Sequence, residues 1–371
     1  MGRTFITKAR EALKDIKPYL PGKPIEEVKR ELGIEDIIKL ASNENPLGPS
    51  KKAVTAMKEA VESVHLYPDG TCYYLKNKIG QKMGVDPSQI IVGNGSDEII
   101  KLLAEAFIEP GDNAIMADPS FSEYDFAVTL MGGYLRKIPL NAHFAHDLDG
   151  MLAAIDDRTK MIFICNPNNP TGTIVTKSQV DAFMTKVPDD VIVVFDEAYH
   201  EYATASDYPK GIDYVKEGWS NVVVMYTFSK IYGLAGLRVG YSIASEALLS
   251  WVYRTREPFN VNSIAQAGAM GALDDDEHVE RSRSVNAKGA EYIYQELEDM
   301  HLSYVKTNTN FIWIDVQTDC VPVFEAMLAK GVIIRTGNVF GFSQFIRVTI
   351  GTMEENRRFI KTLREVLSDK A

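Results

Sequence analysis

VVVMYTFSKIYGLAGLR, residues 222–238, is the stretch that decides how the fold of this chain is read. The apolar, largely β-branched run Val222–Tyr226 is typical of a strand covered on both faces of a sheet. Lys230 follows it, with two hydroxyl side chains before it, two glycines after it and Arg238 eight residues further on. A primary amine held at the rigid end of a strand can react with a carbonyl carbon. A lone loop lysine is most often simply solvated, so this interpretation depends on the other motifs.

Strands and helices alternate around this stretch, from about residue 90 to residue 245. Helical segments such as 97–108 and 177–186 separate short apolar runs, and several of these runs are nearly continuous. The alternation predicts an α/β fold, in which a large domain has a mostly parallel central sheet flanked by helices. The expected strands are Ile90–Val92, Asn113–Met116, Tyr134–Lys137, Met161–Cys165, Val191–Phe195, Val222–Tyr226 and Val239–Ile243.

The pattern changes after about residue 262, where a long helical segment over 276–299 precedes short apolar runs and two further helices. This predicts a smaller α+β domain. Near the other end, residues 41–50 (ASNENPLGPS) hold two prolines and a glycine and cannot form a regular element. We expect an N-terminal arm (1–45) that contributes to the small domain, a large domain (46–270) and a small C-terminal domain (271–371).

Length, charge and cysteine content limit the classes of protein to which the chain can belong. Its 371 residues suffice for two domains, and a formal net charge of −11 argues against bulk binding to nucleic acid. No apolar run approaches membrane-spanning length, so we expect no membrane partner. The three cysteines form no CxxC pair, which fits a reducing compartment, and we expect a cytoplasmic protein. His143 and His146 form an HxxH without acidic or cysteine partners at zinc-ligand spacing, so we expect surface loop residues and no metal site.

Three further motifs each follow a predicted strand. Residues 93–98 (GNGSDE) open a helix, where free backbone N–H groups can bind an anion, although a plain capped turn has the same pattern. Residues 166–172 (NPNNPTG) place Asn169 before a proline, which holds it extended. Asp196 ends a buried run and needs a partner for its charge, and Tyr199 lies three residues on.

Because the carboxyl ends of parallel strands meet at one edge of a sheet, these motifs should face one crevice. Together they offer an amine, a buried acid, two donors for a phenolate oxygen and a phosphate cradle. Pyridoxal 5′-phosphate requires this set for its aldehyde, its ring nitrogen, its O3′ and its phosphate.

The assembled chain resembles the fold-type-I pyridoxal-phosphate aminotransferases over nearly its whole length, and within them most closely the histidinol-phosphate aminotransferases. The segments that carry the resemblance are YLPGKPIEEVKRELG (19–33), KLASNENPLGPS (39–50), YPDG (67–70), NPNNPTGT (166–173), FSKIYGLAGLRVGY (228–241) and, less specifically, IRVTIGT (346–352).

The resemblance implies a role for each matching residue. Lys230 binds the cofactor aldehyde as a Schiff base, Asp196 pairs with the pyridine nitrogen, and Asn169 and Tyr199 contact O3′. Phe121, where many relatives have tyrosine, stacks on the ring. The residues expected around the cofactor phosphate are Ser96, Asp97, Thr227, Ser229 and Arg238.

The resemblance also implies partners. Tyr67 is expected to reach the cofactor phosphate of a neighbouring subunit, which implies a homodimer with shared active sites. Arg347 is expected to hold the anionic end of the substrate. Asn43, Tyr19 and Arg335 are weaker substrate-site candidates, and for Arg335 a surface salt bridge is an equal alternative.

The function implied is transamination between L-histidinol phosphate, an amino phosphate ester, and the 2-oxo acid 2-oxoglutarate. An aromatic amino-acid aminotransferase is the nearest alternative, because it has the same fold and mechanism. A decarboxylase of an amino-acid phosphate ester and a regulator that senses pyridoxal phosphate are more distant alternatives. The regulator needs an attached DNA-binding module, whereas only about 40 residues precede the first core-like motif, and the acidic net charge also disfavours it.

Overall fold

The computed structural model describes residues 8–14, 16 and 24–368. Among these residues seven strands form one large sheet in the order β2-β8-β7-β6-β5-β3-β4. β3 to β7 run parallel, and β8 is antiparallel to both of its neighbours, so the expected α/β fold with a mostly parallel sheet is confirmed. The strands are β2 (Ile90–Gly93), β3 (Asn113–Asp118), β4 (Tyr134–Pro139), β5 (Thr159–Cys165), β6 (Ile192–Asp196), β7 (Val222–Thr227) and β8 (Gly240–Ala244).

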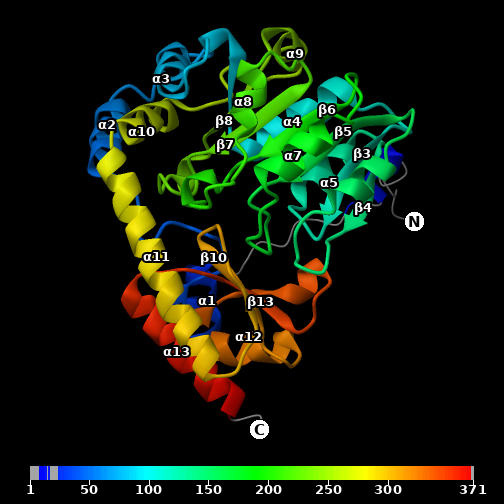
Figure 1. Ribbon diagram of the computed structural model, residues 1–371. Coiled ribbons are helices and arrows are strands. Elements are labelled where there is room, and N and C mark those ends of the chain that lie inside the picture. Colours follow the sequence, from blue (N-terminus) through cyan, green and yellow to red (C-terminus); the bar gives the residue numbers. More distant parts are fainter. Residues whose placement is uncertain (1–7, 15, 17–23, 369–371) are drawn as a thin grey trace, which may run out of the picture.

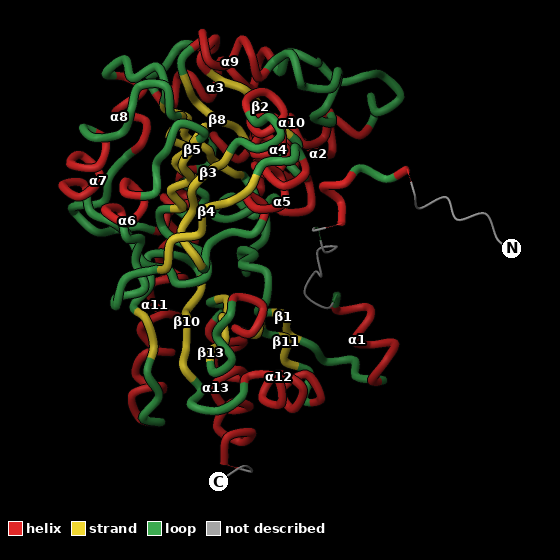
Figure 2. Tube along the Cα trace, turned by 90° about the vertical axis from the view of Figure 1, so that its right-hand side faces the viewer, coloured by secondary structure: helices red, strands yellow, loops and turns green. Residues whose placement is uncertain are grey.

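Helices cover both faces of this sheet, which explains its continuous apolar runs. Along β7, for example, Val222 and Val224 point into one apolar cluster and Val223 into the other. In Figure 2 the strands lie between α6, α7 and α8 on one side and α4 and α5 on the other. One face carries α4 (Ser96–Phe107), α5 (Glu123–Leu130) and α9 (Glu246–Val252). The other carries α2 (Lys51–Val61), α3 (Tyr73–Met83), α6 (Leu148–Ala153), α7 (Lys177–Met184), α8 (Gly211–Lys216) and α10 (Ser263–Leu273).

A second, smaller unit lies below the large sheet in Figure 1, and α11 (Asp276–Asp299) runs from one unit to the other. The antiparallel sheet of the small unit has the order β12-β13-β10-β9. Its own apolar core is closed by α11, α12 (Cys320–Ala329) and α13 (Met353–Ser368). The strands are β9 (Tyr304–Val305), β10 (Phe311–Asp315), β12 (Arg335–Thr336) and β13 (Phe345–Thr349).

Residues 24–40 join the small unit before the chain enters the large one. After α1 (Ile25–Leu32), β1 (Ile38–Lys39) pairs in parallel with β11 (Val332–Ile333). Given these pairings, we propose the division into arm 1–45, large domain 46–270 and small domain 271–371 as the domain organisation.

The irregular segment that follows β1 packs directly against the loop that carries Lys230. Asn45 Nδ2 donates to the carbonyl of Ile231 at 2.7 Å. Gly233 has a φ of +68°, and a Cβ there would lie 2.2 Å from the carbonyl oxygen of Gly48, so only glycine fits. The arm therefore forms one wall beside the lysine.

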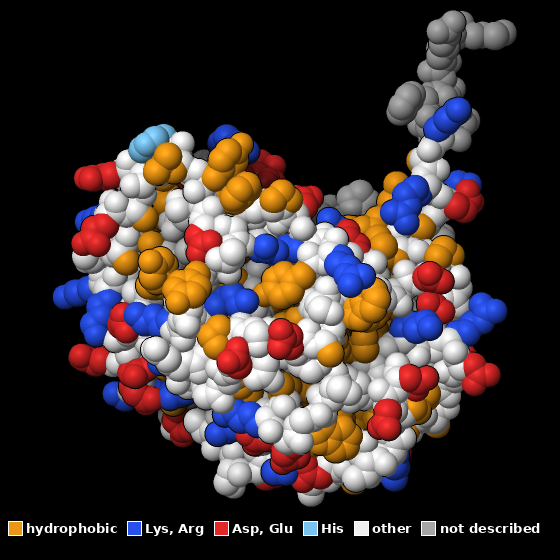
Figure 3. Space-filling model, turned by 90° about the horizontal axis from the view of Figure 1, so that it is seen from above, with side chains coloured by type: hydrophobic (Ala, Val, Ile, Leu, Met, Phe, Trp, Pro, Cys, Tyr) orange, Lys and Arg blue, Asp and Glu red, His pale blue; other side chains and the backbone are white. Residues whose placement is uncertain are grey.

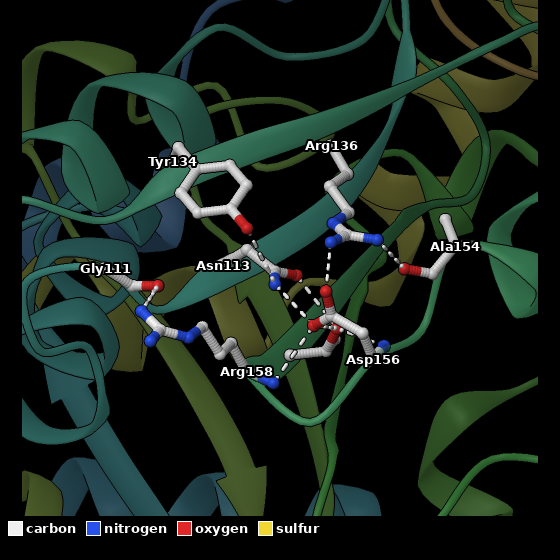
Figure 4. A network of polar contacts seen from close by, with 8 residues as sticks. Gly111, Asn113, Tyr134, Arg136, Ala154, Asp156 and Arg158 are labelled. Atoms are coloured by element: carbon white, nitrogen blue, oxygen red, sulfur yellow. Dashed lines mark hydrogen bonds and ion pairs between the residues drawn. The ribbon is translucent and has the colours of Figure 1, made fainter.

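A polar network fixes the opposite, amino-terminal ends of β3, β4 and β5 (Figure 4). The fully buried Asn113 donates to Asp156 Oδ1 at 2.8 Å and accepts from Thr159 Oγ1 at 2.9 Å. Arg136 forms an ion pair with the same carboxylate and donates to the carbonyl of Ala154 at 2.8 Å. Side-chain hydrogen bonds therefore stabilise the amino-terminal ends of these strands, in addition to the backbone hydrogen bonds of the sheet. The motifs lie at the opposite, carboxyl ends.

Replacing Asn113 with alanine should lower the free energy of unfolding by about 1–3 kcal/mol, because it leaves buried polar partners unsatisfied. Urea denaturation followed by circular dichroism measures this change. Asn338→Ala, at an exposed position, is the matched control and should change stability by less than about 0.5 kcal/mol. Equal stability of the two variants would show that the network contributes nothing.

Across residues 8–368, apart from the undescribed positions 15 and 17–23, no helix has the length and apolar character needed to cross a bilayer.

Candidate active site

A pocket of about 440 Å³ lies at the carboxyl ends of β5, β6 and β7, between the two units and against the arm. It brings together most of the residues singled out from the sequence. Those that line it are Asn43, Ser96, Asp97, Phe121, Asn169, Asp196, Tyr199, Thr227, Ser229, Lys230, Arg238, Arg335 and Arg347.

Lys230 extends into this pocket from the loop after β7. Its Nζ lies 3.4 Å from the carbonyl oxygen of Ser42, to which it donates, and 5.5 Å from the centroid of the Tyr199 ring. Burial, with a smaller contribution from the charge of Arg347, lowers the pKa of Lys230 to about 8. A neutral, nucleophilic amine is therefore accessible close to neutral pH.

Asp196 is the last residue of β6, and its side chain is buried. Its Oδ2 accepts a hydrogen bond from the phenol of Tyr124 at 2.7 Å, and its Oδ1 accepts from the backbone N–H of Ala198 at 3.1 Å. Burial raises the pKa of Asp196 to about 6, and these two donors oppose that rise. A buried carboxylate of this kind favours a ligand that brings a positive charge to it.

Two neutral donors lie beside the lysine and the aspartate. Tyr199 accepts a hydrogen bond from Asn43 Nδ2 at 2.9 Å, and burial raises the pKa of Tyr199, so the phenol stays protonated. Arg347 Nη1 donates to Asn169 Oδ1 at 2.5 Å, which leaves the amide NH₂ as the donor of that side chain. A phenol and an amide can thus both serve one acceptor oxygen.

An anion cradle forms the third part of the pocket. Gly95, with a φ of +84°, precedes the first residues of α4, Ser96 and Asp97, whose backbone N–H groups belong to the first turn of that helix. Arg238 Nη2 donates to Asp97 Oδ2 at 2.8 Å, which holds the guanidinium beside the helix N-terminus. The hydroxyl groups of Thr227 and Ser229 line the same pocket. Helix N–H groups, hydroxyls and a guanidinium suit a phosphate group.

The small unit supplies two arginines to the pocket. Arg335 on β12 lies opposite Arg347 on β13 in the antiparallel ladder, and both side chains line the pocket. Arg347 is buried between the rings of Phe311 and Phe340, at 5.3 and 5.7 Å from their centroids, and donates to the carbonyl of Ala41 at 2.8 Å. Paired guanidinium groups favour an anionic ligand.

Of the expected site residues that the structure describes, Tyr67 is not part of this pocket. Tyr67 is 83% exposed and stacks on Phe259 with ring centroids 4.8 Å apart, so it does not line the pocket of its own chain. Tyr19 lies outside the described residues.

The expectation that both residues of the HxxH lie on the surface is wrong for His146. Its ring is buried, and Nε2 lies 3.2 Å from Oδ1 of Asn168, which also accepts from the hydroxyl of Ser120 at 2.8 Å. Burial lowers the pKa of His146 to about 4, so the ring is neutral and supports the 166–172 loop.

Sequence reasoning missed several residues of the site. Ser42, Glu44, Glu123 and Cys165 line the pocket, and Tyr124 contacts Asp196 from behind. The irregular segment 41–50 could have indicated Ser42 and Glu44, and Cys165 could have been found because it ends an expected strand. No sequence pattern indicates Glu123 or Tyr124.

The residues present fit the pyridoxal phosphate that the resemblance implies. An amine, a buried carboxylate, two neutral donors and an anion cradle line one pocket, and each matches one group of that molecule. Lys230 would hold the aldehyde carbon, Asp196 the ring nitrogen, Tyr199 and Asn169 the phenolate oxygen, and the start of α4 with Arg238 the phosphate.

Replacing Gly95 with alanine should weaken binding of pyridoxamine 5′-phosphate to the cofactor-free protein roughly tenfold or more, as loss of a charge-assisted hydrogen bond does. A Cβ at this position would lie 2.7 Å from Arg238 Nη2 and displace the guanidinium. Isothermal titration measures the affinity.

Gly218→Ala is the matched control, because Gly218 also has a positive φ, of +94°, but a Cβ there meets no atom within 4 Å. Both variants carry the backbone strain, and only the first should lose affinity. Equal affinities of the Gly95→Ala and Gly218→Ala variants would show that the start of α4 does not bind the cofactor phosphate.

Comparison with known proteins agrees with this geometry. The family model "Aminotransferase class I and II" matches residues 35–363. A histidinol-phosphate aminotransferase of Moorella thermoacetica is 55% identical over 98% of this chain and 94% of its own length. Another, from Caldicellulosiruptor saccharolyticus, is 51% identical over 96% of this chain and 99% of its own. The crystal structure of histidinol-phosphate aminotransferase from Sinorhizobium meliloti in complex with pyridoxal-5′-phosphate has a TM-score of 0.91 and 25% identity, and covers 98% of this chain and 99% of its own.

Proposed function

The chain belongs to the class I and II aminotransferases, and on this premise we propose that it transfers the amino group of L-histidinol phosphate to 2-oxoglutarate. The products are imidazole-acetol phosphate and L-glutamate, and the reaction is a step of histidine biosynthesis. Pyridoxal 5′-phosphate is the cofactor. The main observation behind the proposal is that Lys230 and Asp196 line the same pocket as Arg335 and Arg347, which lie opposite each other on β12 and β13.

When bound, pyridoxal phosphate would supply an aldehyde that takes up the amino group and a ring that accepts the electron pair left when Cα loses its proton. Lys230, whose pKa is lowered to about 8, removes the proton from Cα of the substrate and returns it at C4′, acting first as base and then as acid. Asp196 would hold the proton on the ring nitrogen, and Tyr199 and Asn169 would donate to O3′.

The arginine pair supports a phosphate ester as the amino donor. L-Histidinol phosphate has no carboxylate, so its phosphate is its anionic end, whereas 2-oxoglutarate brings carboxylates to the same place. Arg347 and Arg335 together place two positive charges in the pocket, and their N–H groups can donate to either a phosphate or a carboxylate. A phosphate ester carries more negative charge than the single carboxylate of an aromatic amino acid, so it uses both arginines better.

Half-reaction kinetics tests the proposal. The loaded enzyme is mixed with L-histidinol phosphate, L-phenylalanine or L-tyrosine, and conversion to the pyridoxamine form is followed by absorbance. Histidinol phosphate should give the largest second-order rate constant for conversion to the pyridoxamine form. Faster conversion by the aromatic amino acids would replace the proposal with an aromatic aminotransferase, and release of carbon dioxide from an amino-acid phosphate ester would replace it with a decarboxylase.

We propose that the enzyme is a homodimer with shared active sites. The end of α2, the start of α3 and Phe259 expose large apolar side chains, and Tyr67 and Phe259 stack on each other. Figure 3 shows hydrophobic side chains, in orange, on the face seen from above. Clustered exposed apolar side chains are typical of an interface. The exposed members are Val61, Val64, Leu66, Tyr67, Tyr73, Tyr74 and Phe259.

Mixing two inactive variants tests the shared site. In a heterodimer of Lys230→Ala and Tyr67→Ala chains, one site holds both lesions and the other holds neither. Co-refolded mixtures should therefore regain up to about a quarter of the wild-type activity per chain, since about half of the dimers are mixed. Sedimentation should give about twice the 41.4 kDa mass of the chain. Absence of any recovery in a verified heterodimer would mean that Tyr67 serves its own chain or no site.

The cysteines are consistent with a reducing compartment. Cys72, Cys165 and Cys320 all lie among the described residues, and each is buried and free. On this basis we propose that the enzyme works in the cytoplasm.

A further inference from the structure

We propose that Tyr124 is a positioning residue for the transamination reaction: its phenol holds the carboxylate of Asp196 in the orientation and charge state that the cofactor ring nitrogen requires. The proposal rests on the proposed function only in taking pyridoxal phosphate as the molecule bound in the pocket.

The position of Tyr124 is fixed by its surroundings. It lies in the first turn of α5 and is fully buried. Its ring is stacked on Phe163, with centroids 4.4 Å apart and planes at 8°, and meets Phe121 edge-on at 5.6 Å. Because both neighbours restrict the ring, the phenol can reach Asp196 Oδ2 at 2.7 Å without losing further side-chain freedom.

The direction of this hydrogen bond follows from the charges. Burial and the nearby carboxylate raise the pKa of Tyr124, so the phenol keeps its proton and donates. Burial alone disfavours the charged form of Asp196, whose pKa is raised to about 6, and a donor to the carboxylate favours the charged form. The backbone N–H of Ala198 supplies the donor to the other oxygen, so Tyr124 completes a two-point hold on the carboxylate.

A negative charge at Asp196 is what keeps the ring nitrogen protonated. Loss of the phenol leaves Oδ2 without this donor and shifts the shared proton toward the carboxylate. The ring nitrogen should then lose its positive charge at lower pH, which weakens both the hold on the cofactor and the electron withdrawal that the reaction uses.

Tyr124→Phe removes the hydroxyl and keeps the ring between Phe163 and Phe121. We expect cofactor-free Tyr124→Phe protein to bind pyridoxamine 5′-phosphate about tenfold to a hundredfold more weakly than wild type, as loss of a hydrogen bond to a charged group does. We also expect the alkaline limb of the pH profile of the half-reaction to move to lower pH by about one unit. The half-reaction uses whichever amino donor converts the wild type, so the substrate assignment does not enter.

Tyr253→Phe is the matched control, since this phenol donates at 2.7 Å to a backbone carbonyl, that of Ile90, away from the pocket. It should leave the affinity and the pH profile unchanged. Tyr124→Phe in an Asp196→Asn background separates positioning from folding: there the hydroxyl should have no further effect on affinity. Wild-type affinity with an unshifted alkaline limb in Tyr124→Phe overturns the proposal, and so does an equal loss of affinity in both backgrounds. A wild type that binds no cofactor refutes the proposed function instead.

Discussion

Lys230→Ala should lower turnover by at least about 10²–10⁴-fold, the range that a positioned general acid–base contributes. The variant loses the amine that moves the proton between Cα and C4′ and also the attachment point of the cofactor. Single-turnover absorbance with histidinol phosphate measures the rate. Borohydride reduction followed by peptide mass spectrometry should find the cofactor on Lys230 in the wild type and on no peptide in the variant.

Lys230→Arg distinguishes the proton transfer from the positive charge. Arginine keeps a cation in the pocket but does not lose its proton near neutral pH, so it should be as inactive as alanine. A small primary amine added to the alanine variant should restore part of the proton transfer, because the cavity left by the side chain opens to the pocket. A variant that retains both turnover and covalent cofactor would refute the role of Lys230.

The fold could be predicted because its strands are buried on both faces. The run Val222–Tyr226 contacts apolar clusters on alternate sides, so its apolar character is continuous and separates it from the amphipathic helices around it. The antiparallel direction of β8 has a local cause as well. Residues 228–239 hold only a short 3₁₀ turn, and a connection without a full crossover helix favours an antiparallel neighbour.

Sheet geometry could predict the site only where residues follow strands, and the resemblance supplied Asn43, Phe121, Arg335 and Arg347. Asp196, Thr227 and Asn169 share the carboxyl edge of one sheet, and sheet geometry brings such residues together. Tyr124 lies on a helix, and whether its phenol meets Asp196 depends on how α5 packs, which no local pattern encodes. The burial of His146 depends in the same way on a loop 22 residues further along the chain.

Asp196→Asn should lower turnover by about 10²–10⁴-fold, the equivalent of breaking a buried ion pair at about 3–5 kcal/mol. The amide has nearly the shape of the carboxylate but cannot hold a proton on the ring nitrogen by charge. Lys230 should still attach to the cofactor, so reduction and mass spectrometry should give the wild-type result while the half-reaction is slow. This pattern separates the loss of electron withdrawal from the loss of binding.

The same substitution should stabilise the cofactor-free protein at neutral pH, because it removes a buried charge whose partner is the cofactor. Folding raises the pKa of Asp196 from 3.8 to about 6, so the folded state binds the proton more tightly than the unfolded state does. Its destabilising effect therefore appears as pH rises through this window and persists above it. Thermal unfolding should give Asp196→Asn an advantage of about 1–3 kcal/mol near pH 7.5 and almost none near pH 4. A stability advantage of equal size at both pH values would mean that burial does not destabilise the charged form of Asp196. A wild-type turnover rate in the variant would mean that Asp196 does not act on the ring nitrogen.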